Sequence, residues 1–445
     1  MRLSFCIALC SAACLLAGAL LPDAARAPRP RKHPVALGTF LQWFLAKDWD
    51  DARWQSEFRA MREVGMRILV FAPTVDSTHK RAYYPTQLPG HRQAEGYPDV
   101  VDACLRNAQA AGIQVFLGLN FHDDWWKKAV RDPAWLYAQM EEGNAVADEL
   151  CRRYHARYPD AFHGWYWVWE VDNLNFKTPE QADVLTRALD INVRYLKALN
   201  PQMPVLLCPF MNARFGTPEA YQALWTQVFA KSALGRGDIF CPQDCVGAGG
   251  LTLEQVAPWF AALGKAAATK PGLRFWSDTE TFSQDDWTSA PLDRFVAQMR
   301  TVQPYVEACL TFAYSHYYSP NVLSPGFQQT YKAYVETGRL EAEPPSTPTR
   351  LRAERQPDGT IELSWDAATD NIGVCGYYVY RNGVRISRRQ TAREAAGATG
   401  RVIYLDKAAL RDAELTYTVQ AYDFAGNVSG KAERIARPSS VVEPK

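Results

Sequence analysis

The 445-residue sequence has almost no imbalance of charge and lacks the signatures of several common enzyme classes. Its 49 Lys and Arg and 48 Asp and Glu give a net charge of +1, which offers no attraction for nucleic acid or an anionic membrane. No Gly-rich phosphate loop follows the first predicted strand, and no Gly-x-Ser-x-Gly segment occurs. Dinucleotide binding and serine hydrolase chemistry are therefore disfavoured, and we expect no cofactor and no nucleic-acid partner.

Histidine and cysteine are too few and too scattered to predict a metal centre. The tract His122-Asp123-Asp124 has no second histidine near it to complete a typical ligand set, so we expect no metal. Three of the ten cysteines fall within the first 27 residues, and the other seven are odd in number, so at least one is a free thiol. Cys241 and Cys245 either form a local disulfide or pack as small apolar side chains.

Residues 1–27 are predicted to be an export signal. Arg2 is followed by an uncharged apolar run over 3–21, and Ala25-Arg26-Ala27 has the small-x-small pattern of a cleavage site. The run is nearly long enough to span a bilayer, so an uncleaved membrane anchor stays open as an alternative. Lipidation of a cysteine and cleavage at an earlier site also stay open. We expect a monomer in the periplasm or outside the cell, with no other membrane attachment.

Between residues 35 and 340, strand-like and helix-like segments alternate eight times. The expected strands are short and apolar: 36–43, 66–72, 114–120, 164–172, 204–209, 238–244, 273–277 and 308–314. The helix-like segments between them carry apolar residues at helical spacing, as in 179–199. This pattern predicts a (β/α)8 barrel of the α/β class, with an open doubly wound sheet as the less favoured alternative.

After a Pro-rich linker at 341–349, the pattern changes to short strands of period two and tight turns over 350–439. Four segments of this tail are distinctive: Leu363-Ser364-Trp365, Asp370-Asn371, Gly376-Tyr377-Tyr378-Val379-Tyr380-Arg381-Asn382-Gly383 and Ala421-Tyr422-Asp423-Phe424-Ala425-Gly426-Asn427. This tail resembles a fibronectin type III module of bacterial secreted enzymes. The resemblance implies a small all-β sandwich that acts as a spacer or adhesive unit without chemistry of its own.

Nearly every predicted barrel strand ends in a polar side chain, with tryptophans among them. The candidate substrate-binding residues are Gln42, Trp43, Asn120, His122, Trp126, Trp169, Asp172, Gln243, Asp244, Asp278, Tyr314 and His316. In a (β/α)8 barrel these strand ends meet on one face. Hydrogen-bonding groups mixed with aromatic rings suit a carbohydrate, which has hydroxyl edges and apolar faces.

Glu170 and Glu280 follow the fourth and seventh predicted strands and are the candidate catalytic residues. Their placement resembles the largest clan of retaining glycoside hydrolases, which implies that Glu170 is the acid/base and Glu280 the nucleophile. That clan usually has Asn before the acid/base, where this chain has Trp169. Two simpler interpretations stay open: Glu170 could be held in a salt bridge, and Asp278, on the same strand face as Glu280, could compete with it.

The barrel region is also similar to a family of secreted bacterial barrel domains of unknown function. The carrying segments are Gly38-Thr39-Phe40-Leu41-Gln42, Gly118-Leu119, Trp125-Trp126, Gly164-Trp165-Tyr166 through Glu170, Gln243-Asp244 with Gly247, and Glu280-Thr281-Phe282. The sequence thus predicts a secreted glycoside hydrolase that cleaves a poly- or oligosaccharide. The alternative is a non-catalytic carbohydrate-binding or cell-envelope scaffold protein on a degenerate barrel.

Overall fold

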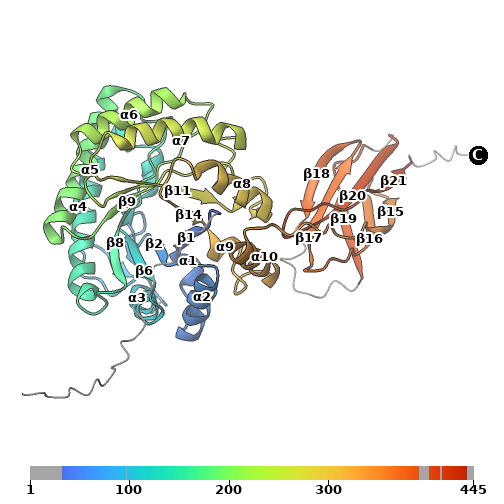
Figure 1. Cartoon of the computed structure of the whole chain (residues 1–445), viewed down its shortest axis with the longest axis horizontal. Coiled ribbons are helices and arrows are strands. Elements are labelled where there is room, and N and C mark those ends of the chain that lie inside the picture. The colour runs from blue at the N-terminus through green and yellow to red at the C-terminus, as the bar shows by residue number, and fades with distance from the viewer. Residues whose placement is uncertain (1–32, 97, 390–399, 411–412, 438–445) are drawn as a thin grey trace, which may run out of the picture. The chain divides into compact units, whose positions relative to one another are not determined.

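Eight parallel strands close into a barrel in the order β1-β14-β11-β10-β9-β8-β6-β2 (Figure 1). The computed structural model describes residues 33–96, 98–389, 400–410 and 413–437, and the predicted export signal lies outside these ranges. The barrel strands are β1 (Ala36–Gln42), β2 (Ile68–Ala72), β6 (Gln114–Gly118), β8 (Phe162–Trp167), β9 (Val205–Leu207), β10 (Ile239–Phe240), β11 (Arg274–Glu280) and β14 (Ala308–Phe312). The predicted (β/α)8 fold is confirmed.

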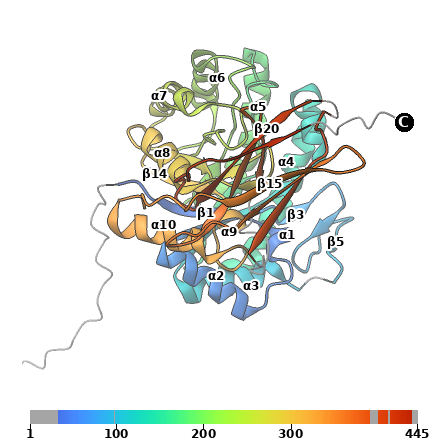
Figure 2. The same ribbon diagram turned by 90° about the vertical axis from the view of Figure 1, so that its right-hand side faces the viewer.

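Helices cover the outside of the barrel strands (Figures 1 and 2). The main ones are α2 (Asp51–Glu63), α3 (Val100–Ala111), α4 (Pro133–Leu150), α5 (Pro179–Leu199), α6 (Pro218–Lys231), α7 (Leu253–Ala268), α8 (Leu292–Val302) and α10 (Pro325–Thr337). Their ends follow local chemistry. A capping box of Thr178 and Gln181 begins α5, and Gly112, with φ of +66°, ends α3 in the left-handed conformation that glycine adopts without strain.

The strands that carry the two predicted catalytic glutamates differ from their predicted lengths. Strand β8 ends at Trp167, five residues before the predicted end, because its neighbour β9 pairs with it only as far as Leu207. Glu170 therefore lies on the loop after the strand. Strand β11 is longer than predicted and continues to Glu280, which pairs in register with Phe312 of β14.

Short elements decorate the end of the barrel where the strands finish. A helical turn, α1 (Trp43–Ala46), follows β1 directly, and another, α9 (Tyr314–Tyr317), follows β14. A small four-stranded sheet contains β3 (Val75–Asp76), β4 (Arg81–Ala82), β5 (Arg92–Gln93) and β7 (Asn120–Phe121). After β11, the chain makes a hairpin of β12 (Phe282–Ser283) and β13 (Thr288–Ser289).

The described residues between 349 and 436, called here the C-terminal module, form two antiparallel sheets, drawn in orange to red in Figure 2. One contains β15 (Thr349–Arg355), β16 (Ile361–Asp366) and β19 (Arg401–Asp406); the other contains β17 (Val374–Arg381), β18 (Val384–Arg389), β20 (Leu415–Asp423) and β21 (Ala432–Ala436). Alternate side chains of both sheets, such as Trp365 and Tyr377, share one apolar core. This arrangement is compatible with the small all-β module expected.

The seven cysteines of the described residues are free thiols, and six of them are buried. Cys241 and Cys245 form no disulfide, so of the two alternatives the packing one holds. The Cys245 sulfur accepts a hydrogen bond from the backbone N–H of Met211 at 3.2 Å, which ties the loops after β9 and β10 together. Within the described ranges, no helix has the length and apolar character required to cross a bilayer.

Candidate active site

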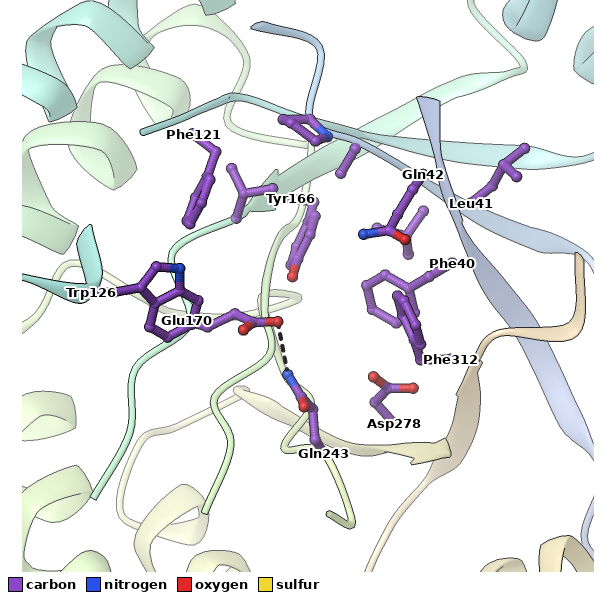
Figure 3. A pocket seen from close by; sticks show the side chains of 14 residues that line it. Phe40, Leu41, Gln42, Phe121, Trp126, Tyr166, Glu170, Gln243, Asp278 and Phe312 are labelled. Atoms are coloured by element: carbon purple, nitrogen blue, oxygen red, sulfur yellow. Dashed lines mark hydrogen bonds between the residues drawn. The ribbon is translucent and has the colours of Figure 1, made fainter. Parts of the chain in front are cut away.

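Glu170 sits at the mouth of the barrel and is held there by its neighbours. The buried indole of Trp125 donates a hydrogen bond to the Glu170 backbone carbonyl at 3.0 Å, which fixes the loop after β8. The Gln243 amide donates to Oε1 of the Glu170 carboxyl at 3.2 Å (Figure 3). Burial, reinforced by the charge of Asp172 and opposed by the Gln243 hydrogen bond, raises the pKa of Glu170 to about 7. The side chain can therefore hold a proton near neutral pH.

Glu280 ends strand β11 and is almost completely buried. The backbone N–H of Ala248 donates to its Oε2 at 2.8 Å. The loop that bears Ala248 passes so close to Glu280 that only glycine fits at position 247. A Cβ on Gly247 would lie 2.4 Å from the Phe282 carbonyl oxygen and 2.9 Å from Oε2 of Glu280. Burial and the charge of Asp244 raise the pKa of Glu280 to about 8, while the Ala248 hydrogen bond and the charge of Arg294 oppose the shift.

Asp244 supports Glu280 from behind. Its Oδ1 accepts the Glu280 backbone N–H at 3.4 Å, and its Oδ2 accepts the Gln298 amide at 2.6 Å. Asp244 is fully buried, and its pKa is raised to about 6, chiefly by that burial. Helix α8 supplies Gln298 and also Arg294, whose guanidinium donates to the Glu280 and Phe282 carbonyls. Asp244 thus acts on the site through Glu280.

Asp278 lies two residues before Glu280 on the same strand face and points deeper into the barrel. Only 2% of it is exposed, and its Oδ1 has no hydrogen-bond partner. Burial and the charges of Glu280, Asp244 and Glu170 raise its pKa well above the usual range. A buried carboxyl oxygen without a partner is costly, so a ligand group that reaches it gains a hydrogen bond that the free protein lacks.

Two connected cavities open between these acids. The outer cleft, of about 640 Å³, is lined by Gln42, Phe44, Glu170, Gln243, Ala248, Glu280, Phe282, Trp287, Phe312, His316 and Tyr317. The inner recess, of about 220 Å³, is lined by Phe40, Leu41, Gln42, Val70, Ala72, Pro73, Phe121, Trp126, Tyr166, Val168, Glu170, Gln243, Asp278 and Phe312. In Figure 3 the Glu170, Gln243 and Asp278 side chains face the recess, with the Tyr166 ring across from Phe312. Glu170 borders both cavities and Glu280 the outer cleft.

Five predicted substrate-binding residues line these cavities: Gln42, Trp126, Gln243, Asp278 and His316. The Gln42 backbone N–H donates to Nε2 of His316 at 3.3 Å, and burial lowers the pKa of His316 to about 4. His316 is therefore neutral, with its Nε2 serving as an acceptor. Trp126 is 46% exposed at the rim of the recess, as a sugar-stacking ring would be.

The other predicted substrate-binding residues do not line either cavity, and three of them, Trp43, Asn120 and His122, lie in the short segments that follow β1 and β6. Asn120 is buried and donates to Ser77 and to the Gln139 carbonyl. His122 accepts the backbone N–H of Asp124 at the start of a short 3-10 helix, and Trp43 stacks on Tyr83 with ring centroids 3.7 Å apart. Each of these side chains stabilises a local structure.

The same holds for Trp169, Asp172 and Tyr314. Trp169 is buried among Phe121, Trp125 and Trp135, on the side of the loop opposite to Glu170. Asp172 accepts two backbone N–H groups in the turn at 174–175. The Tyr314 hydroxyl donates to Gln328 of α10 at 2.5 Å. As described above, Asp244 lies behind Glu280 and away from both cavities.

Several residues that line the cavities or contact Glu280 were not singled out as candidates from the sequence. Phe40, Tyr166 and Phe312 form the apolar wall of the recess, and each lies inside a strand. Alternation along the strands could have found them, because Phe40 lies two residues before Gln42 and Tyr166 four before Glu170. Arg294 and Gln298 come from helix α8, where no local pattern marks them. Among the described residues, no group of three or more His, Cys, Asp or Glu is arranged to hold a metal ion.

Residues 37–324 match a protein family described as a domain of unknown function, DUF4434. The match covers more than half of the sequence. The chain belongs to this family. The DUF4434 barrel is similar to a candidate α-L-fucosidase from Bacteroides thetaiotaomicron, with a TM-score of 0.58 and 19% identity over 72% of this chain and 99% of that one. At this identity the likeness shows a shared fold and nothing about the reaction.

Curated relatives match shorter stretches of this DUF4434 protein. Chitinase Chi52 of Paenibacillus xylanexedens is 37% identical over 106 residues, which is 24% of this chain and 18% of that enzyme. Chitinase A1 of Niallia circulans is 38% identical over 96 residues, 22% of this chain and 12% of that enzyme. The chain thus spans less than a fifth of these relatives, and each match is too short to include a whole barrel.

Proposed function

We propose that this protein is a retaining glycoside hydrolase, with Glu170 as general acid/base and Glu280 as nucleophile. The observation that carries the proposal is that these two carboxyls line one cleft at the mouth of the barrel in different surroundings. Glu170 accepts a single side-chain hydrogen bond from a neutral amide, whereas Glu280 accepts a backbone N–H and lies near the Arg294 guanidinium. The roles are proposed from position, with Glu170 after the fourth barrel strand and Glu280 at the end of the seventh; the pKa of Glu280, about 8, lies above that of Glu170, about 7, so Glu280 must release its proton before it can attack.

The proposed reaction has two steps. Glu170 donates its proton to the glycosidic oxygen while Glu280 attacks the anomeric carbon, which releases the leaving group and forms a covalent glycosyl-enzyme ester. Glu170, now ionised, then takes a proton from water, and the resulting hydroxide displaces Glu280 and regenerates both side chains. A retaining mechanism requires the two carboxyl groups to lie about 5–5.5 Å apart with substrate bound.

The recess beyond Glu170 is the proposed binding site for the sugar unit that is transferred. Its polar groups gather around Gln243 and Asp278, and Phe40, Tyr166 and Phe312 supply apolar surface for the ring. We propose that Asp278 bonds a substrate hydroxyl through the Oδ1 that has no partner in the protein. The proposed substrate is an oligo- or polysaccharide outside the cytoplasm, where the predicted export signal would deliver the protein. The sandwich at 350–439 is proposed as a separate domain after the barrel.

The test is turnover of a panel of poly- and oligosaccharides by the native protein and by Glu170→Gln and Glu280→Gln. Each variant is expected to lose at least about a thousandfold in kcat. Azide added to Glu280→Gly should restore release of an activated leaving group and give a glycosyl azide of inverted configuration. Binding of a glycan without turnover by the native protein, or undiminished turnover by both Gln variants, would overturn the proposal and favour the scaffold alternative.

A further inference from the structure

The hairpin of β12 and β13 carries an exposed aromatic ring next to Glu280. Trp287 is 54% exposed and stacks on Phe282 with centroids 5.6 Å apart and planes at 6°. Phe282 stacks in turn on Tyr317, again at 5.6 Å. The three rings line the outer cleft together with Glu280. We propose that they form a subsite on which a further sugar unit of the substrate stacks, and that Arg388 of the C-terminal module is the positioning residue that holds this subsite in place.

The backbone of Trp287 needs support from outside the hairpin. Its φ of +51° is in the left-handed region, where a bulky side chain is strained. A residue stays in this conformation only when its surroundings fix it, and such residues cluster at functional sites. The hairpin itself is short: its two strands pair through Phe282 with Ser289 and Ser283 with Thr288. Two pairs of residues are too few to fix its conformation alone.

Arg388 supplies that support on both sides of Trp287. Its Nε donates to Oδ2 of Asp286 at 3.0 Å and its Nη2 to Oδ1 of Asp286 at 2.6 Å, and the guanidinium also bonds the Thr288 hydroxyl. Asp286 and Thr288 are the residues immediately before and after Trp287. The Arg388 side chain is 11% exposed and that of Asp286 31%, so the guanidinium is mostly covered while the carboxylate still borders solvent. Planar Arg–carboxylate pairs of this kind fix geometry as well as add energy.

The C-terminal module also contacts helix α8, whose Arg294 and Gln298 side chains donate hydrogen bonds to the Glu280 backbone carbonyl. The first backbone N–H groups of α8 have no side-chain cap, and those of Leu292 and Asp293 donate instead to the carbonyls of Phe424 and Ala425 at 3.0 and 2.9 Å. Such N–H groups need partners when buried. The Phe424 ring packs on Phe327 of α10 with centroids 4.7 Å apart. The module therefore takes part in the site and is more than a spacer.

The ligand class follows from the ring surface and rests on the proposed function. A pyranose presents an apolar face of C–H groups, which packs well on an aromatic ring. Because the three rings line the outer cleft beside Glu280 and do not line the recess, they would contact a sugar other than the one in the recess. The subsite thus selects an oligosaccharide of two or more units over a monosaccharide linked to a small aglycone.

The first experiment tests Arg388 without any substrate, so it stands even if the proposed hydrolase activity fails. Amide hydrogen exchange of the peptide covering 282–289 is compared in the native full chain, Arg388→Ala and Arg388→Lys. We expect exchange to rise roughly tenfold in Arg388→Ala, because charge-assisted bonds are lost, and to a smaller extent in Arg388→Lys. Arg385→Ala is the matched control, since Arg385 lies on the same strand but packs over Tyr378 of its own module. Equal exchange in Arg388→Ala and Arg385→Ala would overturn the inference.

The second experiment tests the subsite by the length of the substrate. Arg388→Ala and Trp287→Ala are each expected to raise KM for the preferred oligosaccharide about tenfold, with little change in KM for a short aryl glycoside of the same sugar. In the double variant the two effects should not add, because they act on one element. A KM increase that is equal for long and short substrates, or fully additive effects, would show that Arg388 does not act through Trp287.

Discussion

The Gln243 side chain donates from the same amide nitrogen to Oε1 of Glu170 at 3.2 Å and to the Cys208 carbonyl at 3.4 Å. The second bond orients the amide, so its N–H rather than its carbonyl faces the acid. A donor in this position stabilises the ionised carboxylate and opposes the effect of burial on its pKa. The pKa of the proposed acid is therefore lowered by a residue that follows the second barrel strand after its own.

Removing this hydrogen bond is expected to move the pH optimum upward. In the native protein Glu170, with a pKa of about 7, must be protonated while Glu280, with a pKa of about 8, must be ionised, so kcat/KM should be bell-shaped with its maximum between these values. Gln243→Leu has no donor, so the pKa of Glu170 rises, more of the protein holds this pair of charge states, and the maximum should shift to higher pH. Measurement of kcat/KM from pH 4 to 10 checks this. An optimum that stays in place would exclude Glu170 as the titrating acid.

Asp244 is expected to control the acidic limb. Its negative charge raises the pKa of Glu280, which must be ionised to act as nucleophile. Asp244→Asn removes that charge, so Glu280 ionises at lower pH and the acidic limb should move down, opposite in direction to the change in Gln243→Leu. The same pH series measures it. The Glu280→Gln variant, which has no carboxyl to titrate there, shows whether any residual limb belongs to another group.

The buried acid Glu280 should cost the protein stability at alkaline pH. Because its pKa is about 8 in the folded protein and 4.5 is its ordinary value, the folded state binds its proton more tightly than the unfolded chain does. Stability from this group is fully present below pH 4.5 and is lost as pH rises towards 8. Glu280→Gln should therefore be more stable than the native protein by about 2 kcal/mol or more at pH 8, with little difference at pH 4.5. Urea unfolding at the two pH values tests this, and a pH-independent difference would contradict it.

Gly247 is expected to tolerate no side chain. A Cβ there would lie 2.4 Å from the Phe282 carbonyl and 2.9 Å from the Glu280 carboxyl, so Gly247→Ala should push the loop away and break the Ala248 hydrogen bond to Oε2. We expect a loss of about a hundredfold in kcat with a smaller effect on KM. Gly235→Ala is the matched control, because a Cβ at Gly235 meets no atom within 4 Å. Equal activity of the two variants would show that the loop is free to move.

The helices were easier to predict than the site because their signals are local. The bounds of α5 agree with the predicted range 179–199, since apolar spacing and the residues at its ends mark both ends of the helix. Strand ends depend on the neighbouring strand, which the sequence does not identify. This is why β8 is shorter and β11 longer than predicted.

Side-chain direction explains most differences between the predicted and observed site. Once Glu170 faces the cavity, alternation puts Trp169 on the other side, where it packs against Trp125. Asn120 belongs to the small sheet with β3, so its side chain leaves the cavity. The support from Arg294, Gln298 and Arg388 could not be predicted, because it comes from segments that approach only in the folded chain.

The hydrogen bonds between Arg388 and the hairpin also bear on when the protein acquires its binding site. The barrel precedes the C-terminal module in the chain, so during synthesis its strands leave the ribosome and can fold first. The outer wall of the cleft is then held only after β18 has emerged and paired with β17. A nascent chain with a closed barrel would bury most of its core, but Phe327 of α10 would still lack its contact with Phe424, and the hairpin would lack its hydrogen bonds to Arg388. Cleavage between the barrel and the module would have the same effect on the mature protein.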